Sequence, residues 1–255
     1  MGDGRSRMAR SVVSYLPSEG LITLRRLREL PAAALRRPHE VDFLAFRDFK
    51  RPNPVIVDVG ANRGQSVVSF RRTIGTAQIH CFEPNPFLHD ELRRFDVEIN
   101  GVALGAHDGE LNLYVPRYGH TLYDTRAALD EVTAANFLSD AHFAGFDPDR
   151  AGVEHINVPV TTLDSFGLAP DIIKIDVEGG GAAVIAGARD TIRAHRPLLL
   201  IEDDGGDSAA LVADLGYELA RYDAGANSLV KGQAGDPNSF LVHPHHSGLL
   251  ALHVV

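Results

Sequence analysis

The sequence is poor in cysteine, in long apolar runs and in glycine-rich phosphate motifs. Its single cysteine, Cys81, excludes an internal disulfide, and the apolar run around it (AQIHCF) favours a buried core residue over a nucleophile. No apolar run reaches the roughly 18–20 residues that a membrane span needs, and the first twenty residues hold no apolar segment typical of a signal peptide. We therefore expect a cytoplasmic protein without a transmembrane segment.

Positive charge is scarce outside the first fifty residues. The formal net charge is −9, and residues 1–50 hold ten Lys and Arg against six Asp and Glu, which leaves −13 for the remaining 205 residues. Proteins that bind nucleic acids carry a basic patch or stripe. The acidic body therefore argues against a nucleic-acid partner. The Ala-, Arg- and Gly-rich composition is typical of a bacterial protein.

Short β-rich runs alternate with helix-like segments from residue 55 onward. The strand-like runs are 55–59, 77–82, 97–104, 171–177 and 197–202, with added strands expected at 110–116, 155–163, 216–222 and 239–244. The helix-like segments are 64–74, 86–95 and 181–195. This alternation predicts an α/β fold with βαβ units around a parallel sheet that is buried on both faces.

Two segments depart from the alternation. Residues 1–52 have helix-like apolar spacing interrupted by prolines, and we interpret them as a helical N-terminal leader on a main domain of residues 53–255. Residues 116–154 form a long insertion between strands, which is typical of a functional or a disordered segment. Its many Phe, Tyr and His residues argue against disorder, so we expect a helical cap insertion.

The run VIVDV ends at an acid that is followed by two glycines four residues apart. The pattern is Asp58-x-Gly60-x-Asn62-x-Gly64. Glycine lets a backbone approach a ligand closely, and ligands of open α/β sheets bind at the carboxyl ends of strands. The spacing lacks the third close glycine of dinucleotide-binding loops and the lysine of phosphate-binding loops, which disfavours an NAD-dependent dehydrogenase. The sequence therefore predicts a ligand at residues 58–66 without a phosphate cradle.

A second acid follows the next strand. Glu83, in IHCFEPNP, lies 19 residues beyond Gly64. A carboxylate in this place is suited to accept hydrogen bonds from both hydroxyls of a ribose. Taken alone, Glu83 is explained equally well as a solvated acid at a strand end. Together with the 58–64 pattern it favours a nucleoside, and a ribose without a phosphate cradle points to S-adenosylmethionine.

Six motifs in order resemble the FkbM family of class I methyltransferases that use S-adenosylmethionine. They are VDVGANRGQS, CFEPNP, GVALGAHDGELNLY, TTLDSF, IIKIDVEG and NSFLV, within about residues 53–243. The resemblance implies a Rossmann-like class I methyltransferase fold with a seven-stranded, mostly parallel sheet and helices on both faces. It also implies methyl transfer from S-adenosylmethionine to a hydroxyl of a small-molecule or glycan acceptor, namely a sugar, a glycoconjugate or a secondary metabolite.

The resemblance assigns a set of residues to the cofactor. They are Asp58, Gly60, Asn62, Gly64, Glu83, Val102, Ala103 and Asp108. The loop residues would line the amino-acid end of S-adenosylmethionine, Glu83 would hold the ribose, and the segment 102–104 would pack near the adenine. Asp108 is equally well explained as a turn residue.

The motif KIDVEG supplies the candidate catalytic residues Asp176 and Glu178, and the cap adds His120 and His142 as candidate bases. At alternating positions of a strand end, the two carboxylates are able to point the same way. They are suited to orient or deprotonate a hydroxyl, and also to hold a divalent cation, so a metal stays an open alternative. A helix cap is the purely structural explanation for either acid.

One position departs from the family pattern. Members of the family read V-E-G-x-E, whereas this chain has Gly181 in place of the second glutamate. Glu202, after the run 197–202, is a candidate to supply an acid from the neighbouring strand. The departure favours the alternative of a binding or regulatory protein with lost or altered catalysis, which the intact Asp58, Glu83 and Asp176 disfavour. The residues DVEG also disfavour methyl transfer to nitrogen, and we expect the tail HPHHSG to be solvated or partly ordered.

Overall fold

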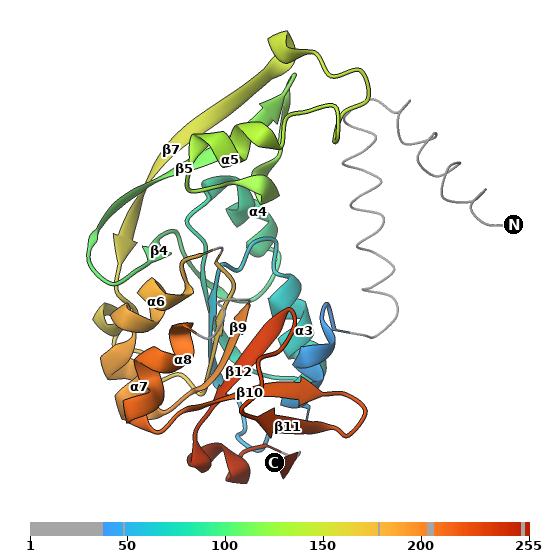
Figure 1. Cartoon of the computed structure of the whole chain (residues 1–255). Helices are drawn as coiled ribbons and strands as arrows, with labels where there is room; N and C mark the ends of the chain where they lie inside the picture. The colour runs from blue at the N-terminus through green and yellow to red at the C-terminus, as the bar shows by residue number, and fades with distance from the viewer. Residues whose placement is uncertain (1–37, 48, 178, 203–206, 251–252) are drawn as a thin grey trace, which may run out of the picture. The chain divides into compact units, whose positions relative to one another are not determined.

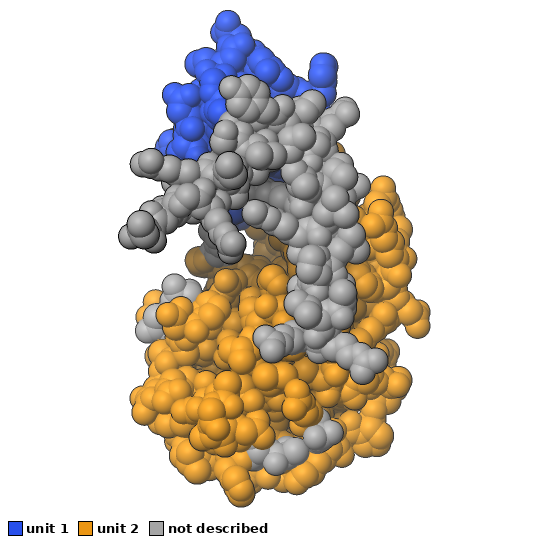
Figure 2. Space-filling model, turned by 90° about the vertical axis from the view of Figure 1, so that its right-hand side faces the viewer, with its two compact units in different colours: residues 1–36, 112–157 blue, residues 37–111, 158–255 orange. Residues whose placement is uncertain are grey.

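The computed structural model of the protein describes residues 38–47, 49–177, 179–202, 207–250 and 253–255 (Figure 1). The chain divides into two compact units, and each is described by itself: residues 37–111 with 158–255, and residues 1–36 with 112–157 (Figure 2). The first 37 residues of the predicted leader lie outside the described part, which begins with the short 3-10 helix η1 (Val41–Phe46). Within the described residues, no helix combines the length and the apolar character needed to cross a bilayer.

Nine strands form the central sheet of the larger unit, in the order β13-β11-β10-β12-β9-β8-β1-β2-β3. Their bounds are Val55–Val59 (β1), Gln78–Phe82 (β2), Glu98–Asn100 (β3), Ile172–Ile175 (β8), Leu198–Glu202 (β9), Glu218–Asp223 (β10), Ser228–Lys231 (β11), Asn238–Val242 (β12) and His253–Val254 (β13). The strands from β3 to β9 in this order are parallel, as the alternation predicts. Strand β12 lies antiparallel between β9 and β10, so the sheet is mixed.

The sheet has two strands more than the seven predicted. Strand β11 pairs antiparallel with β10, and β13 pairs in parallel with β11. Both are short, and the sequence around β11 is rich in glycine, alanine and polar residues, so no clear alternation indicates them. The other seven strands correspond to the predicted runs, although the run 97–104 divides into β3 and the separate strand β4 (Ala103–Leu104).

Apolar side chains cover both faces of the sheet because successive residues of a strand point to opposite sides. On one face, Ile56 of β1 packs with Phe70 of α3 (Gln65–Thr73) and with Phe46 of η1. On the other face, Val57 packs with Val184 of α6 (Gly181–Gly187). Figure 1 shows η1 and α3 on one side of the sheet and α6, α7 and α8 on the other. The prediction of helices on both faces is thus confirmed.

The remaining helices of the larger unit are short. They are η2 (Pro86–Leu88), α4 (His89–Leu92), η5 (Leu163–Phe166), α7 (Arg189–His195), α8 (Asp207–Val212), η6 (Ala213–Leu215) and η7 (Pro244–Gly248). The predicted helix 181–195 is interrupted at Ala188, where α6 ends and α7 begins. Cys81 is fully buried in the core, as its apolar surroundings predict.

The tail HPHHSG is ordered as η7, and most of its residues are exposed, but one of them is buried. Within η7, the imidazole of His246 is only 1% exposed. Its Nδ1 accepts a hydrogen bond from the backbone N–H of His243 at 2.9 Å, and its Nε2 lies 2.8 Å from the carbonyl oxygen of Arg196. Both ring nitrogens are therefore used by the backbone, and the histidine fastens the end of β12 to the end of α7.

Strands flank the predicted insertion of residues 116–154, as the runs 110–116 and 155–163 predict, and three short helices lie within it. Its role as a cap stays a prediction. A second sheet has the order β4-β7-β5-β6, with β5 (Gly109–Tyr118), β6 (Thr121–Leu122) and β7 (Ala151–Thr161). The smaller unit adds only η3 (Asp124–Arg126), α5 (Glu131–Asn136) and η4 (Pro148–Arg150). Its aromatic residues pack on one another, with the rings of Tyr118 and Phe143 4.5 Å apart. This cluster explains the aromatic richness of the segment.

Candidate functional site

Acidic side chains lie at the carboxyl ends of four neighbouring strands. Asp58 lies in β1, Glu83 follows β2, Asp176 follows β8 and Glu202 ends β9. Because these strands are parallel and lie in the order β2-β1-β8-β9, their carboxyl ends form one edge, with neighbouring strands about 4.8 Å apart. The acids that the sequence singles out are therefore brought together.

The two glycines of the loop have separate structural reasons. Gly60 has a φ of +79°, and a Cβ there would overlap the carbonyl oxygen of Asp176 on the neighbouring strand. Gly64 has a φ of +85° at the start of α3, and a Cβ there would overlap the ring of Phe95. Asn62, between them, also adopts a left-handed backbone with a φ of 48°. The loop therefore turns tightly over the carboxyl end of β1, with its backbone close to the edge.

Asp58 lies beneath the loop and is fully buried. Its Oδ2 accepts a hydrogen bond from the hydroxyl of Ser66 on α3, while its Oδ1 has no partner among the described residues. Burial raises the pKa of Asp58, and the nearby charge of Lys174 opposes this shift. An unsatisfied carboxylate oxygen at this depth is an acceptor for a donor that the chain itself does not provide.

Glu83 joins the loop to the end of β2. Its Oε2 accepts a hydrogen bond from the backbone N–H of Asn62, and its Oε1 accepts one from that of Asn85, both at 2.9 Å. Each carboxylate oxygen has a second lone pair, so two further donors are able to bind. The residue is only 6% exposed, and burial raises the pKa of Glu83 to about 7.

Asp176 and Glu202 form a hydrogen-bonded pair across the ends of β8 and β9. The ammonium of Lys174, whose side chain is 4% exposed, donates to Asp176 Oδ2 at 2.6 Å. Burial favours the neutral acid, but the hydrogen bond with Glu202 and the charge of Lys174 outweigh it and lower the pKa of Asp176. The hydrogen bond with Asp176 and then burial raise the pKa of Glu202 to about 8. The two shifts are opposite in direction, so Glu202 is the acid of the pair that more readily holds a proton.

Several residues beside this pair were not found from the sequence. Asn238, at the start of β12, is the ladder partner of Glu202 and donates through Nδ2 to Glu40 Oε2 at 2.8 Å and to Asp42 Oδ2 at 3.1 Å. No local pattern connects residues almost two hundred positions apart. Lys174 did have a signal, because a lysine inside the buried run IIKI requires an anionic partner.

The structure leaves other predicted residues outside this group. Val102 packs with the apolar cluster that contains Phe82, and Ala103 is buried in β4. Asp108 is exposed and accepts a hydrogen bond from the hydroxyl of Thr161 at 2.7 Å, which agrees with its alternative explanation as a turn residue. Their predicted place near an adenine stays a prediction.

Three candidate catalytic residues also stay predictions. Glu178 lies outside the described residues. His120 and His142 are exposed residues of the smaller unit, and the imidazole of His142 lies beside the ring of Phe137. The described residues contain no group of three or more His, Cys, Asp or Glu side chains arranged to hold a metal ion.

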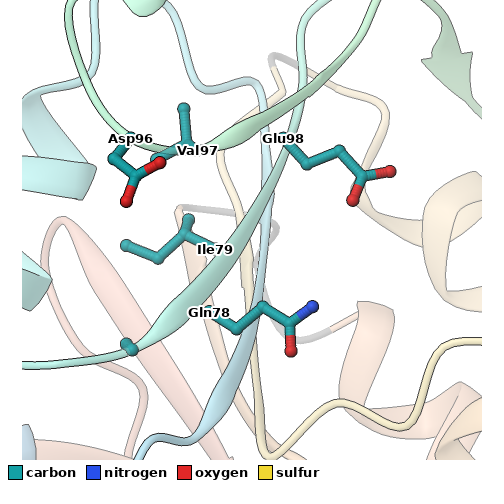
Figure 3. A pocket seen from close by; sticks show the side chains of 6 residues that line it. Gln78, Ile79, Asp96, Val97 and Glu98 are labelled. Carbon is teal, nitrogen blue, oxygen red and sulfur yellow. The ribbon is translucent and has the colours of Figure 1, made fainter.

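A pocket of about 350 Å³ lies away from the acidic edge. It is lined by Ala77, Gln78, Ile79, Asp96, Val97 and Glu98, at the amino ends of β2 and β3 (Figure 3). Glu83 follows the opposite end of β2. Gln78, Asp96 and Glu98 are exposed, so the pocket lacks the buried polar groups that distinguish the carboxyl edge.

Comparison with known proteins finds a family match that includes the four acids of this edge. The model of the methyltransferase FkbM domain matches residues 58–219, from the acid of the loop to β10. The chain belongs to the FkbM methyltransferase family. Its predicted identity as a member of a methyltransferase family is thereby confirmed, and four acids of the edge lie within the matched region. His39, Glu40 and Asn238, which lie beside the pair, are outside it.

Individual proteins that the chain resembles are more distant. The chain is 29% identical over 204 residues to the 2-O-methyltransferase NoeI of Sinorhizobium fredii (strain NBRC 101917 / NGR234), which is 71% of this chain and 78% of that protein. The solved methyltransferase FkbM from Methylobacillus flagellatus KT is 17% identical with a TM-score of 0.49, over 81% of this chain and 48% of that one. This chain thus spans about half of that solved chain. Fibrillarin from Aeropyrum pernix is 14% identical with a TM-score of 0.38, over 84% and 73% of the two chains.

Proposed function

We propose that the protein transfers a methyl group from S-adenosylmethionine to a hydroxyl of a sugar, a glycoconjugate or a secondary metabolite. The observation that carries the proposal is Glu83, buried at the end of β2 with both carboxylate oxygens held by backbone N–H groups and one lone pair free on each. The two vicinal hydroxyls of a ribose are the donors that such a carboxylate accepts. Transfer to oxygen is supported by the likeness to a 2-O-methyltransferase.

The residues of the edge fit S-adenosylmethionine. The backbone at Gly60 and Gly64 leaves no room for side chains of its own, and Asp58 Oδ1 is buried without a partner among the described residues. Glu83 would hold the ribose, and the loop of residues 60–64 would hold the amino-acid end. The sulfonium and the ammonium of this molecule are both cationic, which suits an edge lined by four acids.

The residues of this chain would contribute position and proton transfer. S-adenosylmethionine, when bound, supplies a methyl group that its positive sulfur already activates. The carboxylate of Glu83 and the loop fix the nucleoside along the edge, so that the acceptor approaches over the ends of β8 and β9. Alignment of the two reactants is a major source of rate acceleration for such a displacement. A carboxylate within reach of the acceptor hydroxyl removes its proton.

A binding or regulatory protein with lost catalysis is the second candidate. Gly181 favours it, because this residue is buried at the start of α6 and provides no carboxylate where the family pattern has one. Such a protein would bind S-adenosylmethionine without transferring its methyl group. The two candidates therefore differ in turnover and not in affinity.

Calorimetric titration with S-adenosylmethionine and S-adenosylhomocysteine tests the ligand. We expect dissociation constants in the micromolar range, on the order of −8 kcal/mol. Glu83→Gln keeps the shape but removes the charge, and we expect it to weaken binding about 10- to 100-fold, the cost of roughly 1.5–3 kcal/mol for hydrogen bonds to a charged group. Glu218→Gln, an exposed glutamate on β10, is the matched control and should bind like the wild type. Absence of binding to folded wild-type protein would contradict the proposal.

Transfer of a radiolabelled methyl group tests the reaction. Methyl α-D-mannopyranoside, methyl β-D-glucopyranoside and methyl α-L-rhamnopyranoside offer secondary hydroxyls in different configurations. Labelled methyl ether on one of them supports the enzyme. Tight binding of S-adenosylmethionine without label on any of them would favour the binding protein.

A further inference from the structure

The proposed reaction needs a group that accepts the proton of the acceptor hydroxyl. Three charged side chains follow one another on the face of the sheet that α3 and η1 cover. Lys174 lies in β8, Asp176 lies two residues later, just after β8, and Glu202 lies at the end of β9. Lys174 donates to Asp176, and Asp176 shares a hydrogen bond with Glu202. The last of these three side chains is the one farthest from Glu83.

We propose that Glu202, held by Asp176, is the general base that receives the proton of the acceptor hydroxyl. The inference rests on the proposed function. In the step, the acceptor oxygen forms a bond to the methyl carbon while the carbon–sulfur bond breaks, and that electron pair stays on the sulfur of S-adenosylhomocysteine. The hydroxyl proton passes to the ionised carboxylate of Glu202, so atoms and charge balance without a further reactant.

Position along the edge favours Glu202. Strands β2 and β9 are three strand spacings apart, roughly 14 Å at about 4.8 Å for each spacing. A nucleoside held at Glu83 and extended over β1 directs its reactive end toward β8. The acceptor then lies over the ends of β8 and β9, where Glu202 is half-buried rather than sealed from solvent.

Charge compensation separates the two acids of the pair. Asp176 is matched by the buried ammonium of Lys174, which stabilises its ionised form and makes it a weak proton acceptor. Among the described residues, Glu202 forms no ion pair with a cation. The charged groups that face Glu202 are Asp176 and Lys174, from β8 and its continuation, and Glu40, from the segment before η1. The charge of His39 influences the pKa of Asp176. Glu202 is therefore the acid of the pair with the stronger affinity for a proton.

The ladder fixes Glu202 in this position. Its partner in β12 is Asn238, whose carboxamide is 1% exposed and bound to Glu40 and Asp42. Strand β12 thus holds the backbone of Glu202, and the pairing of Ile201 with Ile175 of β8 holds the residue before it. The end of β9 therefore supplies an acid to the edge, whereas Gly181, after β8, lacks the family's second glutamate.

Rates of methyl transfer from labelled S-adenosylmethionine to the best of the three methyl glycosides test the assignment. We expect Glu202→Gln to lower kcat at pH 8 by at least about 100-fold, the contribution typical of a general base, with S-adenosylmethionine affinity unchanged within about threefold. Wild-type kcat should rise with pH, pass half its maximum near pH 8 and level off above about pH 9, and Glu202→Gln should lose this dependence. Glu202→Asp, which keeps a carboxylate, should retain the pH dependence at reduced rate. Glu218→Gln should match the wild type.

Each result decides the assignment. If Glu202→Gln, or Glu202→Asp should the first variant not fold, keeps the wild-type rate and pH profile, the assignment to Glu202 is wrong while the proposed function stands. If only Asp176→Asn abolishes the pH dependence, Asp176 is the base. If the wild type binds no S-adenosylmethionine, the proposed function itself fails. Binding without transfer to any glycoside counts against both.

Discussion

At the carboxyl end of β1, the backbone of Gly60 passes so close to the carbonyl oxygen of Asp176 that no side chain fits between them. This contact, and not the turn alone, explains why a glycine follows the run VIVDV. The sequence predicts the loop because glycine spacing is local, and it predicts the acids because they end apolar runs. It does not reveal the pairing of Asp176 with Glu202 or the role of Lys174, which depend on the lateral order of β1, β8 and β9.

Substituting Gly60 separates close approach from backbone strain. We expect Gly60→Ala to abolish binding of S-adenosylmethionine and to lower the free energy of unfolding by more than about 1 kcal/mol, because its φ is +79° and its Cβ would meet Asp176. Gly75→Ala is the matched control, since Gly75 has a φ of +89° but no atom within 4 Å of a Cβ. Urea unfolding of both variants measures the difference. Equal losses of stability would show that only the φ angle counts.

The pH dependence of binding reports on Glu83. Burial raises the pKa of Glu83 to about 7 in the ligand-free protein, and ribose hydroxyls donate only to lone pairs of the ionised carboxylate. Affinity for S-adenosylhomocysteine should therefore be constant above about pH 8 and fall as the pH drops through 7, approaching about tenfold for each further unit. Calorimetry between pH 5.5 and 8.5 measures it. Glu83→Gln should give a weaker and nearly flat profile, and an equally steep one would assign the proton elsewhere.

Among elements, the parallel strands are the most predictable part of the fold. Runs such as VIVDV and PLLLIE are buried on both faces, and that leaves a continuous apolar signal. Elements whose stability depends on distant partners escaped prediction. Strand β11 lacks a clear alternation, and α6 and α7 read as one helix.

The element η7 gives a pH-dependent contribution to stability. Burial lowers the pKa of His246 to about 4, because the fold binds the neutral imidazole. Since its pKa in the folded protein lies below the ordinary histidine value of about 6.5, this contribution is complete above about pH 6.5 and is lost as the pH falls toward 4, a change of roughly 3 kcal/mol. Urea unfolding across this range should show the decline, and His246→Ala should reduce it. His245→Ala, at an exposed position, is the control, and an equal effect of both would contradict the assignment to His246.

In the larger unit as a whole, an aromatic cluster joins the beginning of the described chain to its end. Phe46 of η1 lies 5.2 Å from Phe70 of α3 and 5.7 Å from Phe240 of β12, measured between ring centres. Periodicity within each segment predicts an apolar face but gives no information on which faces meet. The family match, residues 58–219, includes neither Phe46 nor Phe240.

Truncating Phe46 tests this connection. We expect Phe46→Ala to lower the free energy of unfolding by about 3–5 kcal/mol, as is usual when a fully buried phenylalanine is replaced. Phe87→Ala, at a residue 43% exposed, should cost much less. Because η1 leads to Glu40, Phe46→Ala should also reduce turnover at temperatures where the protein stays folded. Chemical unfolding and methyl transfer measured on the same samples check both effects, and a loss below about 1 kcal/mol would contradict the packing role.

The place of β12 in the sheet has a consequence for synthesis of the chain on the ribosome. Residues 238–242 are made after β9 and β10, yet they insert between these two strands. Until they emerge, β9 presents an unpaired edge and η1 lacks the ring of Phe240. Contacts this distant in sequence slow folding. Nascent chains stalled before residue 238 should therefore resist collapse into a protease-resistant form, and the sheet beside the acidic edge is completed only after residues 238–242 have emerged.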